Sequence, residues 1–460
     1  MNEDLAPRPI SASSRSSGLR RLRARLIARL RAMATRFPVT LMLIIAAACC
    51  AQWPLGEGYA AAARALVRYE GMVASNVLPL LAGAGLALAA SLFSEGIRLP
   101  QRRSVPLSAL GGFIGFVLLK FHVALSVYFG AVLPAIVGLA LIAPFLNRGG
   151  RDAFWHWLFR MAMLTLRTGL LALALGVALS VIALALNHIL GFGAGRLALV
   201  RVWAFVGLLV APIAALIMIP RNFDTEPVVD LDAFVFGPVR TVLDWVAAPF
   251  LLIYAAMLHI YAVRILFGSH IPDGEIGVFA LIFSIVLVGS VVVLRPLRRS
   301  VRPLTWFLLK WWPALLVAPI LLLLVAGLLR VRDAGVTPDR YLFILAALSL
   351  AAIVAIQVSL RTRNYLRPIL MVPVFALVIA SFGPWGALGV SIPSQTNRFK
   401  ELVAKRPLGE ADILSARSML MFLDRYDALA DITPDNMPAA DSRGQKFLRA
   451  RIAAAYKLDQ

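Results

Sequence analysis

The sequence is poor in charged residues for its length. Asp, Glu, Lys and Arg make up 15% of its 460 residues, whereas apolar and aromatic residues make up 60%. A soluble fold of this size needs far more polar surface than this composition provides. Acidic residues are especially few, with 24 against 46 basic ones, which leaves a formal net charge of +22. The composition therefore argues against an ordinary soluble protein and indicates a membrane protein.

Cysteine and histidine are also scarce. The two cysteines, Cys49 and Cys50, are neighbours in one apolar run, and neighbours in a helix cannot form a disulfide framework or a tetrahedral metal site. The five histidines are scattered without the spacing of a metal site. The sequence holds no phosphate-binding loop, no HExxH and no CxxC. We therefore expect no metal and no cofactor, and we assign no catalytic residue.

Long apolar runs are what the sequence has in abundance. About 20 apolar residues cross the roughly 30 Å of hydrocarbon in a bilayer. About eleven such runs between residues 38 and 392 predict an all-α, polytopic transmembrane helix bundle. The third run is short and rich in glycine, which leaves open whether it crosses fully. The expected spans are 38–55, 76–94, 105–119, 123–145, 168–190, 197–219, 242–267, 275–294, 306–329, 341–360 and 368–391.

Arginines gather in every second loop, for example at Arg102 and Arg298, and the loops between are poorer in basic residues or balanced by acids. Cytoplasmic loops carry such an excess. The pattern places the N-terminus in the cytoplasm, and an odd number of spans places the C-terminus on the outer side of the membrane. It also explains the net charge without a nucleic-acid partner. The loop at 221–240 is ambiguous because it contains four acidic residues.

The two ends of the chain differ from the spans. Residues 1–17 are polar without periodicity, which predicts disorder, whereas leucines at spacings of three and four between arginines predict a basic amphipathic helix over 18–37. That helix suits anionic lipid headgroups or serves as an orientation signal. The tail, 393–460, predicts two or three amphipathic helices, with Ser394 capping Gln395–Ala404. They would pack on the membrane domain or on an envelope partner.

The seventh predicted span is the most polar. Ionisable side chains within a span tend to face a bundle interior or a watery cavity, so we take five residues of this span as candidates for a substrate cavity. Simpler roles stay open: the end residues could snorkel to the interface, the histidine could be a packing residue, and the tyrosines could form an aromatic belt. The five candidates are Asp244, Tyr254, His259, Tyr261 and Arg264.

Three turn-rich stretches complete the pattern. The first follows the seventh span, the second precedes the tenth span, where Thr337 or Asp339 could cap a helix that has Pro338 in its first turn, and the third follows the last span. Their notable residues are Pro272, Gly274, Thr337, Asp339, Arg340, Tyr341, Gly383, Pro384, Ser394, Gln395 and Arg398.

Together these stretches resemble a bacterial polytopic membrane family, domain-of-unknown-function family 4153, over roughly residues 40 to 400. The resemblance implies a multi-spanning protein of a bacterial inner membrane, in which the outer side, where the C-terminus is expected, is the periplasm. It implies no known reaction, so it supplies no catalytic residues.

Three functions remain in view. Transport of a small molecule or lipid is favoured by the number of spans and the polar seventh span. A scaffold or sensor that binds an envelope partner through its tail is favoured by the amphipathic tail and the basic arm. An enzyme acting on lipid-linked substrates is least favoured, because nothing in the sequence resembles a nucleophile paired with a base.

Overall fold

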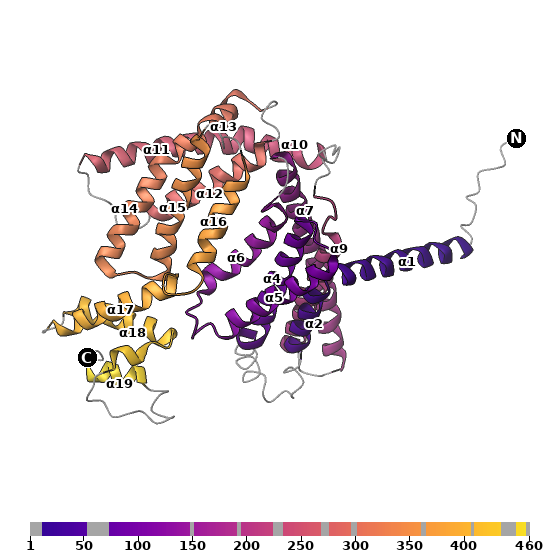
Figure 1. The fold of residues 1–460 in the computed structure, drawn as a ribbon, viewed down its shortest axis with the longest axis horizontal. Helices are drawn as coiled ribbons and strands as arrows, with labels where there is room; N and C mark the ends of the chain where they lie inside the picture. The colour runs from indigo at the N-terminus through magenta and orange to yellow at the C-terminus, as the bar shows by residue number, and fades with distance from the viewer. Residues whose placement is uncertain are drawn as a thin grey trace. The chain divides into compact units, whose positions relative to one another are not determined.

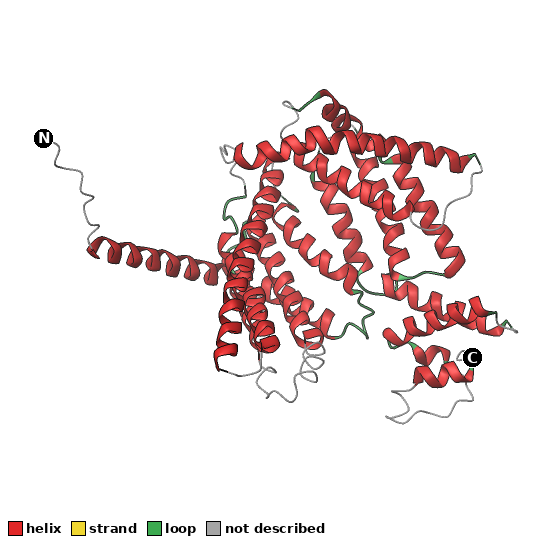
Figure 2. Cartoon of the chain, turned by 180° about the vertical axis from the view of Figure 1, so that it is seen from behind, coloured by secondary structure: helices red, strands yellow, loops and turns green. Residues whose placement is uncertain are grey.

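A computed structural model describes residues 12–52, 73–147, 151–190, 195–223, 233–267, 276–295, 301–359, 365–405, 409–433 and 448–456. Within these ranges every regular element is a helix and there is no strand (Figures 1 and 2). Eight helices in the described part are long and apolar enough to cross a membrane, or nine when one bent pair counts as a span. The predicted all-α, polytopic class is therefore confirmed.

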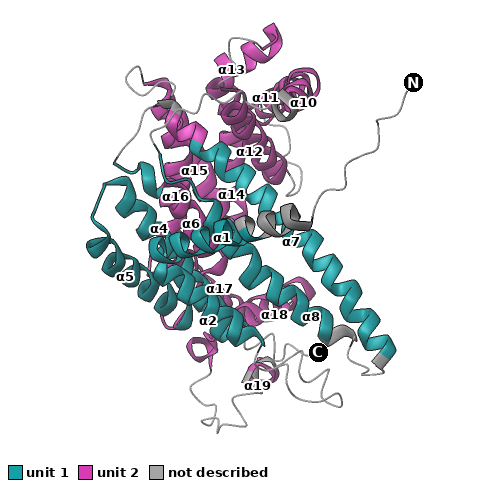
Figure 3. Cartoon of the chain, turned by 90° about the vertical axis from the view of Figure 1, so that its right-hand side faces the viewer, with its two compact units in different colours: residues 1–120, 143–149, 157–223 teal, residues 121–142, 150–156, 224–460 magenta. Residues whose placement is uncertain are grey.

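The contacts divide the chain into two compact units (Figure 3). Unit 1 comprises residues 1–120, 143–149 and 157–223, and unit 2 comprises residues 121–142, 150–156 and 224–460. The helices of unit 1 are α1 (Ala12–Arg36), α2 (Pro38–Gln52), η3 (Val73–Val77), α4 (Leu78–Gly96), α5 (Gln101–Lys120), η4 (Ala143–Phe145), most of α7 (Arg151–Leu190), α8 (Gly195–Phe205), η5 (Val206–Val210) and α9 (Ala211–Met218).

Unit 2 holds the other membrane helices and the tail. Its helices are α6 (Phe129–Ile142), α10 (Ala233–Val242), η6 (Leu243–Ala247), α11 (Ala248–Leu266), α12 (Ile276–Leu294), α13 (Pro303–Leu315), α14 (Val317–Ala334), α15 (Pro338–Val358), α16 (Arg367–Ala380), α17 (Ala387–Ala404), α18 (Glu410–Arg425), η8 (Leu429–Ile432) and α19 (Leu448–Ala455).

Each predicted span coincides with an apolar helix. Eight of them fall in the eight candidate spans, and the first corresponds to α2, which bends by 103° from the end of α1. The other two, 123–145 and 368–391, correspond to the shorter apolar helices Phe129–Phe145 and Arg367–Ala380. The apolar pattern therefore located the helices. The count of eleven holds only if both short helices also cross.

Several predicted boundaries were wrong. The helix of the fifth span, α7, begins at Arg151 instead of residue 168. The last span ends at Ala380 instead of 391, because Gly383 takes a positive φ of 81° and a new helix, α17, begins at Ala387. Ser394 consequently lies inside α17 and does not cap a helix. The N-terminal helix begins at Ala12 instead of residue 18, and the remainder of the expected disorder, 1–11, lies outside the described residues.

Helix α5, the weakest predicted span, is seated against α4 by its glycines. A Cβ on Gly115 would lie 2.6 Å from the carbonyl oxygen of Ala82, and one on Gly111 would lie 2.9 Å from that of Leu86. Hydrogen bonds join the same helices, since the Ser91 hydroxyl donates to Ser108 Oγ at 3.0 Å. Small residues at i and i+4 let membrane helices pack backbone to backbone. The glycines that shorten the apolar run therefore build the contact.

We expect Gly115→Leu to force α4 and α5 apart, because the added side chain would overlap the α4 backbone. Overpacking of this kind costs about 1–3 kcal/mol. The measurement is the thermal unfolding temperature in detergent. Gly289→Leu in α12 is the matched control, since nothing lies within 4 Å of a Cβ at Gly289. Equal unfolding temperatures for the two variants would contradict the close packing of α4 on α5.

The tail forms a small helical unit with its own core, the C-terminal module of α17, α18, η8 and α19. Phe399, Leu423 and Ile452, from three different helices, are each 0% exposed. Tyr456 packs edge-on against Phe399, with ring centroids 5.4 Å apart. The predicted amphipathic helices of the tail therefore bury their apolar faces against one another.

Candidate functional site

The predicted cavity residues lie on one continuous helix, Gly237–Leu266, made of α10, η6 and α11. Figures 1 and 2 show this helix running crosswise to α12, α14 and α15. It packs on α12, α13 and α14, and its buried stripe includes Asp244, Leu251, Ala255 and Leu258. In a bundle of parallel helices such a stripe could line a central cavity. Here it meets neighbours that cross it.

Asp244 is the deepest charged group of this helix, with 4% of its surface exposed. Its Oδ2 lies 3.4 Å from Nε of Arg240, one turn earlier, and its Oδ1 has no hydrogen-bond partner among the described residues. Asp244 falls in η6, a single π-helical turn, and such turns are frequent at functional sites. A buried carboxylate oxygen without a donor is costly, which makes Asp244 the most unusual group of the span.

Of the other four candidates, His259 and Tyr254 have local partners and Arg264 faces outward, whereas the buried hydroxyl of Tyr261 has no hydrogen-bond partner among the described residues. Nδ1 of His259 lies 2.7 Å from the carbonyl oxygen of Ala255, which can only accept, so Nδ1 carries the proton. Tyr254 stacks on Phe283 at 5.7 Å between ring centroids, and Arg264 is exposed. At about 100° per residue, His259 lies roughly 140° around the helix from Tyr254 and roughly 160° from Tyr261. The structure does not gather the five side chains, and their role as a cavity stays a prediction.

The motif residues of unit 2, in contrast, do converge. Helix α14 ends at Ala334 and α15 begins at Pro338, so residues 335–337 form a tight turn. Gly335 has φ 71° and ψ 178°, a conformation open to glycine and strained for other residues. A Cβ on Gly335 would also lie 2.9 Å from Nε2 of Gln395. The backbone conformation thus requires glycine here, and a larger residue would also displace the Gln395 amide.

Four side chains hold this turn, and we call them the clasp: Arg340, Ser394, Gln395 and Arg398. Nε2 of Gln395 donates to the carbonyl oxygens of Ala334 at 3.1 Å and Val336 at 2.9 Å. The Ser394 hydroxyl accepts from the Val336 N–H at 2.9 Å.

The two arginines of the clasp bind the end of α14 itself. Nη1 of Arg340 donates to the carbonyl oxygens of Ala334 at 2.8 Å and Gly335 at 2.7 Å. Arg398 donates to the carbonyl oxygens of Arg332, at 3.1 Å, and Asp333.

The clasp answers a general need of helix ends. The last carbonyls of a helix have no partner within it, and the helix dipole makes that end negative. Guanidinium groups supply both hydrogen-bond donors and positive charge, and the Gln395 amide donates to two of the carbonyl oxygens. Because Gln395 is 3% exposed, water does not readily replace it. The clasp is therefore a capping site. Its side chains are hydrogen-bonded to backbone groups at the end of α14 and in the α14–α15 turn, and its role is structural.

The start of α15 is tied to its surroundings by two tyrosines. Thr337 occupies the predicted N-cap position without making a side-chain cap bond. Oδ1 of Asp339 accepts from the Tyr128 hydroxyl at 3.2 Å, and the Tyr341 hydroxyl donates to the carbonyl oxygen of Trp385 at 2.8 Å. Burial, together with the charge of Asp339, raises the pKa of Tyr128 to about 12. Its hydroxyl therefore stays protonated and keeps donating at neutral pH.

Sequence reasoning identified most of this site and missed part of it. Gly383, with its φ of 81°, and the exposed Pro384 form the α16–α17 turn as expected for a turn motif. Tyr128 was missed, because a lone tyrosine 211 residues from its partner carries no motif. Pro272 and Gly274, like the acidic loop at 224–232, lie outside the described residues.

We expect Gln395→Ala to loosen the α14–α15 turn, because the carbonyl oxygens of Ala334 and Val336 lose their shared donor. An unsatisfied buried group costs about 1–3 kcal/mol. Hydrogen–deuterium exchange of the peptides covering residues 330–341 should accelerate. Gln52→Ala is the matched control, since Gln52 Nε2 also donates to a backbone carbonyl, that of Arg201, but in unit 1. Unchanged exchange at 330–341 in Gln395→Ala would refute the clasp.

Comparison of the chain with protein-family models, with curated proteins and with solved structures finds no match.

Proposed function

We propose that the protein is a non-transporting membrane scaffold or sensor whose C-terminal module binds an envelope protein. The clasp is the observation that supports this proposal. Side chains of α17 form hydrogen bonds with backbone groups at both ends of the α14–α15 turn, and these bonds fix α17 to the turn. A module with its own core, mounted in a set orientation on membrane helices, is suited to present a surface or to pass a displacement on to the spans. The clasp offers no comparable arrangement for chemistry.

The outer side of α18 is the surface that this module presents. Leu414 is 66% exposed and Met421 is 57% exposed, and seven residues place them on the same side of the helix. Their neighbours on the opposite side, including Leu420 and Leu423, fill the core of the module. An apolar pair that the core leaves uncovered fits an apolar anchor of a protein partner.

We further propose that the chain belongs to the family of unknown function that its motifs resemble and resides in a bacterial inner membrane. Four of the eleven motif residues of that resemblance form the clasp, which supports a shared structural role for these four. The described helices give eight spans, nine if the bent pair counts as one, and eleven if both short apolar helices also cross. An odd count supports our proposal that the arm and the module lie on opposite sides of the membrane, and the arginine-rich loops favour the cytoplasm for the arm and the periplasm for the module. The basic arm would then contact anionic lipid headgroups.

The proposed function predicts that crosslinkers at two positions of α18 capture the same partner protein. A photo-crosslinking amino acid at position 414 or 421, introduced into the full chain in cells, should yield the same protein adduct. The double substitution Leu414→Ser and Met421→Ser should reduce co-purification of that protein about tenfold or more, as expected when two anchors of an interface are lost.

Two controls make this result specific. Ser415→Ala with Ser418→Ala changes the same helix, but both hydroxyls bond only their own helix backbone, so partner binding should persist. The crosslinker at position 420, which is 3% exposed, should give no partner adduct. Adducts with lipid alone at 414 and 421 would contradict a protein partner.

Transport of a small molecule or lipid is a second candidate, favoured by Asp244 alone. A carboxylate that is buried in an apolar helix and left with an unpaired oxygen is the kind of group that handles ions or polar substrates in membrane proteins. His259 points to a different side of the helix from Tyr254 and Tyr261, so the transport hypothesis lacks a cavity that these residues share.

If transport is the function, Asp244→Asn should abolish it while the protein accumulates normally, because the substitution keeps the shape and removes the charge. The measurement compares metabolites and lipids in cytoplasm, envelope and medium of a deletion strain carrying either form. A compound that wild type redistributes and Asp244→Asn does not would support transport. Arg264→Gln, on the exposed side, is the control and should act as wild type. Identical profiles with and without the wild-type gene would eliminate this candidate.

A further inference from the structure

We infer that a hollow between α1 and α9 binds the phosphate group of an anionic phospholipid. The hollow has a volume of about 550 Å³, within the range of ligand sites. It is lined by three arginines, Arg29, Arg36 and Arg221, together with apolar side chains that include Met33 and Leu216. This inference deepens the proposed contact of the arm with lipid and rests on that contact. It is independent of the partner proposed for the C-terminal module.

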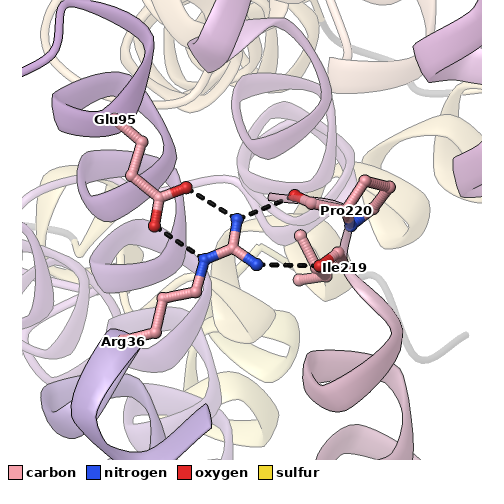
Figure 4. A network of polar contacts seen from close by, with 4 residues as sticks. All are labelled: Arg36, Glu95, Ile219 and Pro220. Atoms are coloured by element: carbon pink, nitrogen blue, oxygen red, sulfur yellow. Dashed lines mark hydrogen bonds and ion pairs between the residues drawn. The ribbon is translucent and has the colours of Figure 1, made fainter. Parts of the chain in front are cut away.

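Arg36 builds the wall of this hollow (Figure 4). Its Nε and Nη2 each donate to an oxygen of Glu95 at 2.7 Å, and Nη1 and Nη2 donate to the carbonyl oxygens of Ile219 and Pro220 at 2.8 Å. Four of its five N–H donors are thus used, and Glu95 neutralises its charge. Its side chain is 12% exposed. Arg36 therefore fixes the end of α1 to the segment that follows α9, and other residues must bind an anion.

Arg29 and Arg221 are the two remaining arginines of the hollow, and we infer that they bind the anion. Both are exposed, and neither has a carboxylate partner among the described residues. Arg29 precedes Arg36 by two helical turns, which places both on the same side of α1. Helix α1 contains no acidic residue, and the carboxylate of Glu95 is already paired with Arg36. Among the described residues that line the hollow none is acidic, so no carboxylate there balances these two guanidinium groups, which suits a phosphate.

The other side of the hollow suits a lipid more than a free anion. Met33 is 5% exposed, Leu216 4% and Ile219 8%, so they give the hollow an apolar wall. The end of α1 and the start of α2 meet at 103°, which lets α2 enter the membrane while α1 runs along its surface. Leu26, at 53% exposure, continues the apolar side of α1. A bend of this kind lies at the depth of the headgroups, where phosphate and acyl chain meet.

The test measures thermal stabilisation of the full-length protein in neutral detergent by short-chain phosphatidylglycerol, phosphatidylcholine or inorganic phosphate. Ligands that bind only the folded state raise the unfolding temperature in a concentration-dependent way. We expect phosphatidylglycerol to stabilise at lower concentration than either of the others. Arg29→Gln with Arg221→Gln should weaken that effect about tenfold or more, since two charge-assisted contacts are lost.

Arg23→Gln with Arg25→Gln removes the same charge from the same arm, away from the hollow, and should leave the stabilisation unchanged. Equal losses in the two double variants would overturn the site, because diffuse attraction to the arm would then explain the effect. Stabilisation by inorganic phosphate as strong as that by phosphatidylglycerol would overturn the lipid. None of these outcomes bears on crosslinking from positions 414 and 421, so this inference and the scaffold function can fail separately.

Discussion

The carbonyl groups at the ends of membrane helices are the constraint on which the described structure most depends. In an apolar environment no water is present to donate to an unpaired carbonyl oxygen. A helix that ends near the membrane therefore needs a hydrogen-bond donor from elsewhere in the chain. Arg36 supplies it after α9, at Ile219 and Pro220, and Arg398 supplies it at the end of α14. In both places a side chain distant in sequence closes the end of a helix.

Arginine serves this purpose because its fork of donors can bind several acceptors at once. Arg36 joins a carboxylate on α4 to two carbonyls after α9, and so determines where α1 leaves the bundle of unit 1. Arg398 and Gln395 join α17 to the α14–α15 turn, and so determine where the C-terminal module is mounted in unit 2. Some of the described arginines therefore stabilise contacts between helices and do not only set the membrane topology. The two roles cannot be told apart from the sequence.

The fold could be predicted from the sequence because it follows from local properties. Runs of apolar residues predict helices wherever they occur, and each expected span coincides with one. The errors arose where a neighbour in space decided the outcome. Ser394 has the chemistry of a helix cap, but α17 already extends past it, and its hydroxyl binds Val336 instead. The glycines of α5 weaken an apolar run, yet the backbone of α4 fits against them. Neither partner is visible along the chain.

The same distinction separates the two sets of candidate residues. The motif residues around Gly335 and Gln395 were recognised as a pattern, and the pattern corresponds to one contact, because backbone conformation and close approach allow few substitutions there. The polar residues of the seventh span were grouped only by their presence on one helix. Helical geometry places His259 and Tyr261 on opposite flanks of the buried stripe. Polarity within a span thus indicates that a residue needs a partner. On this span the need is unmet, in the described part of the chain, at Asp244, a buried carboxylate with one unpaired oxygen, and at the buried hydroxyl of Tyr261.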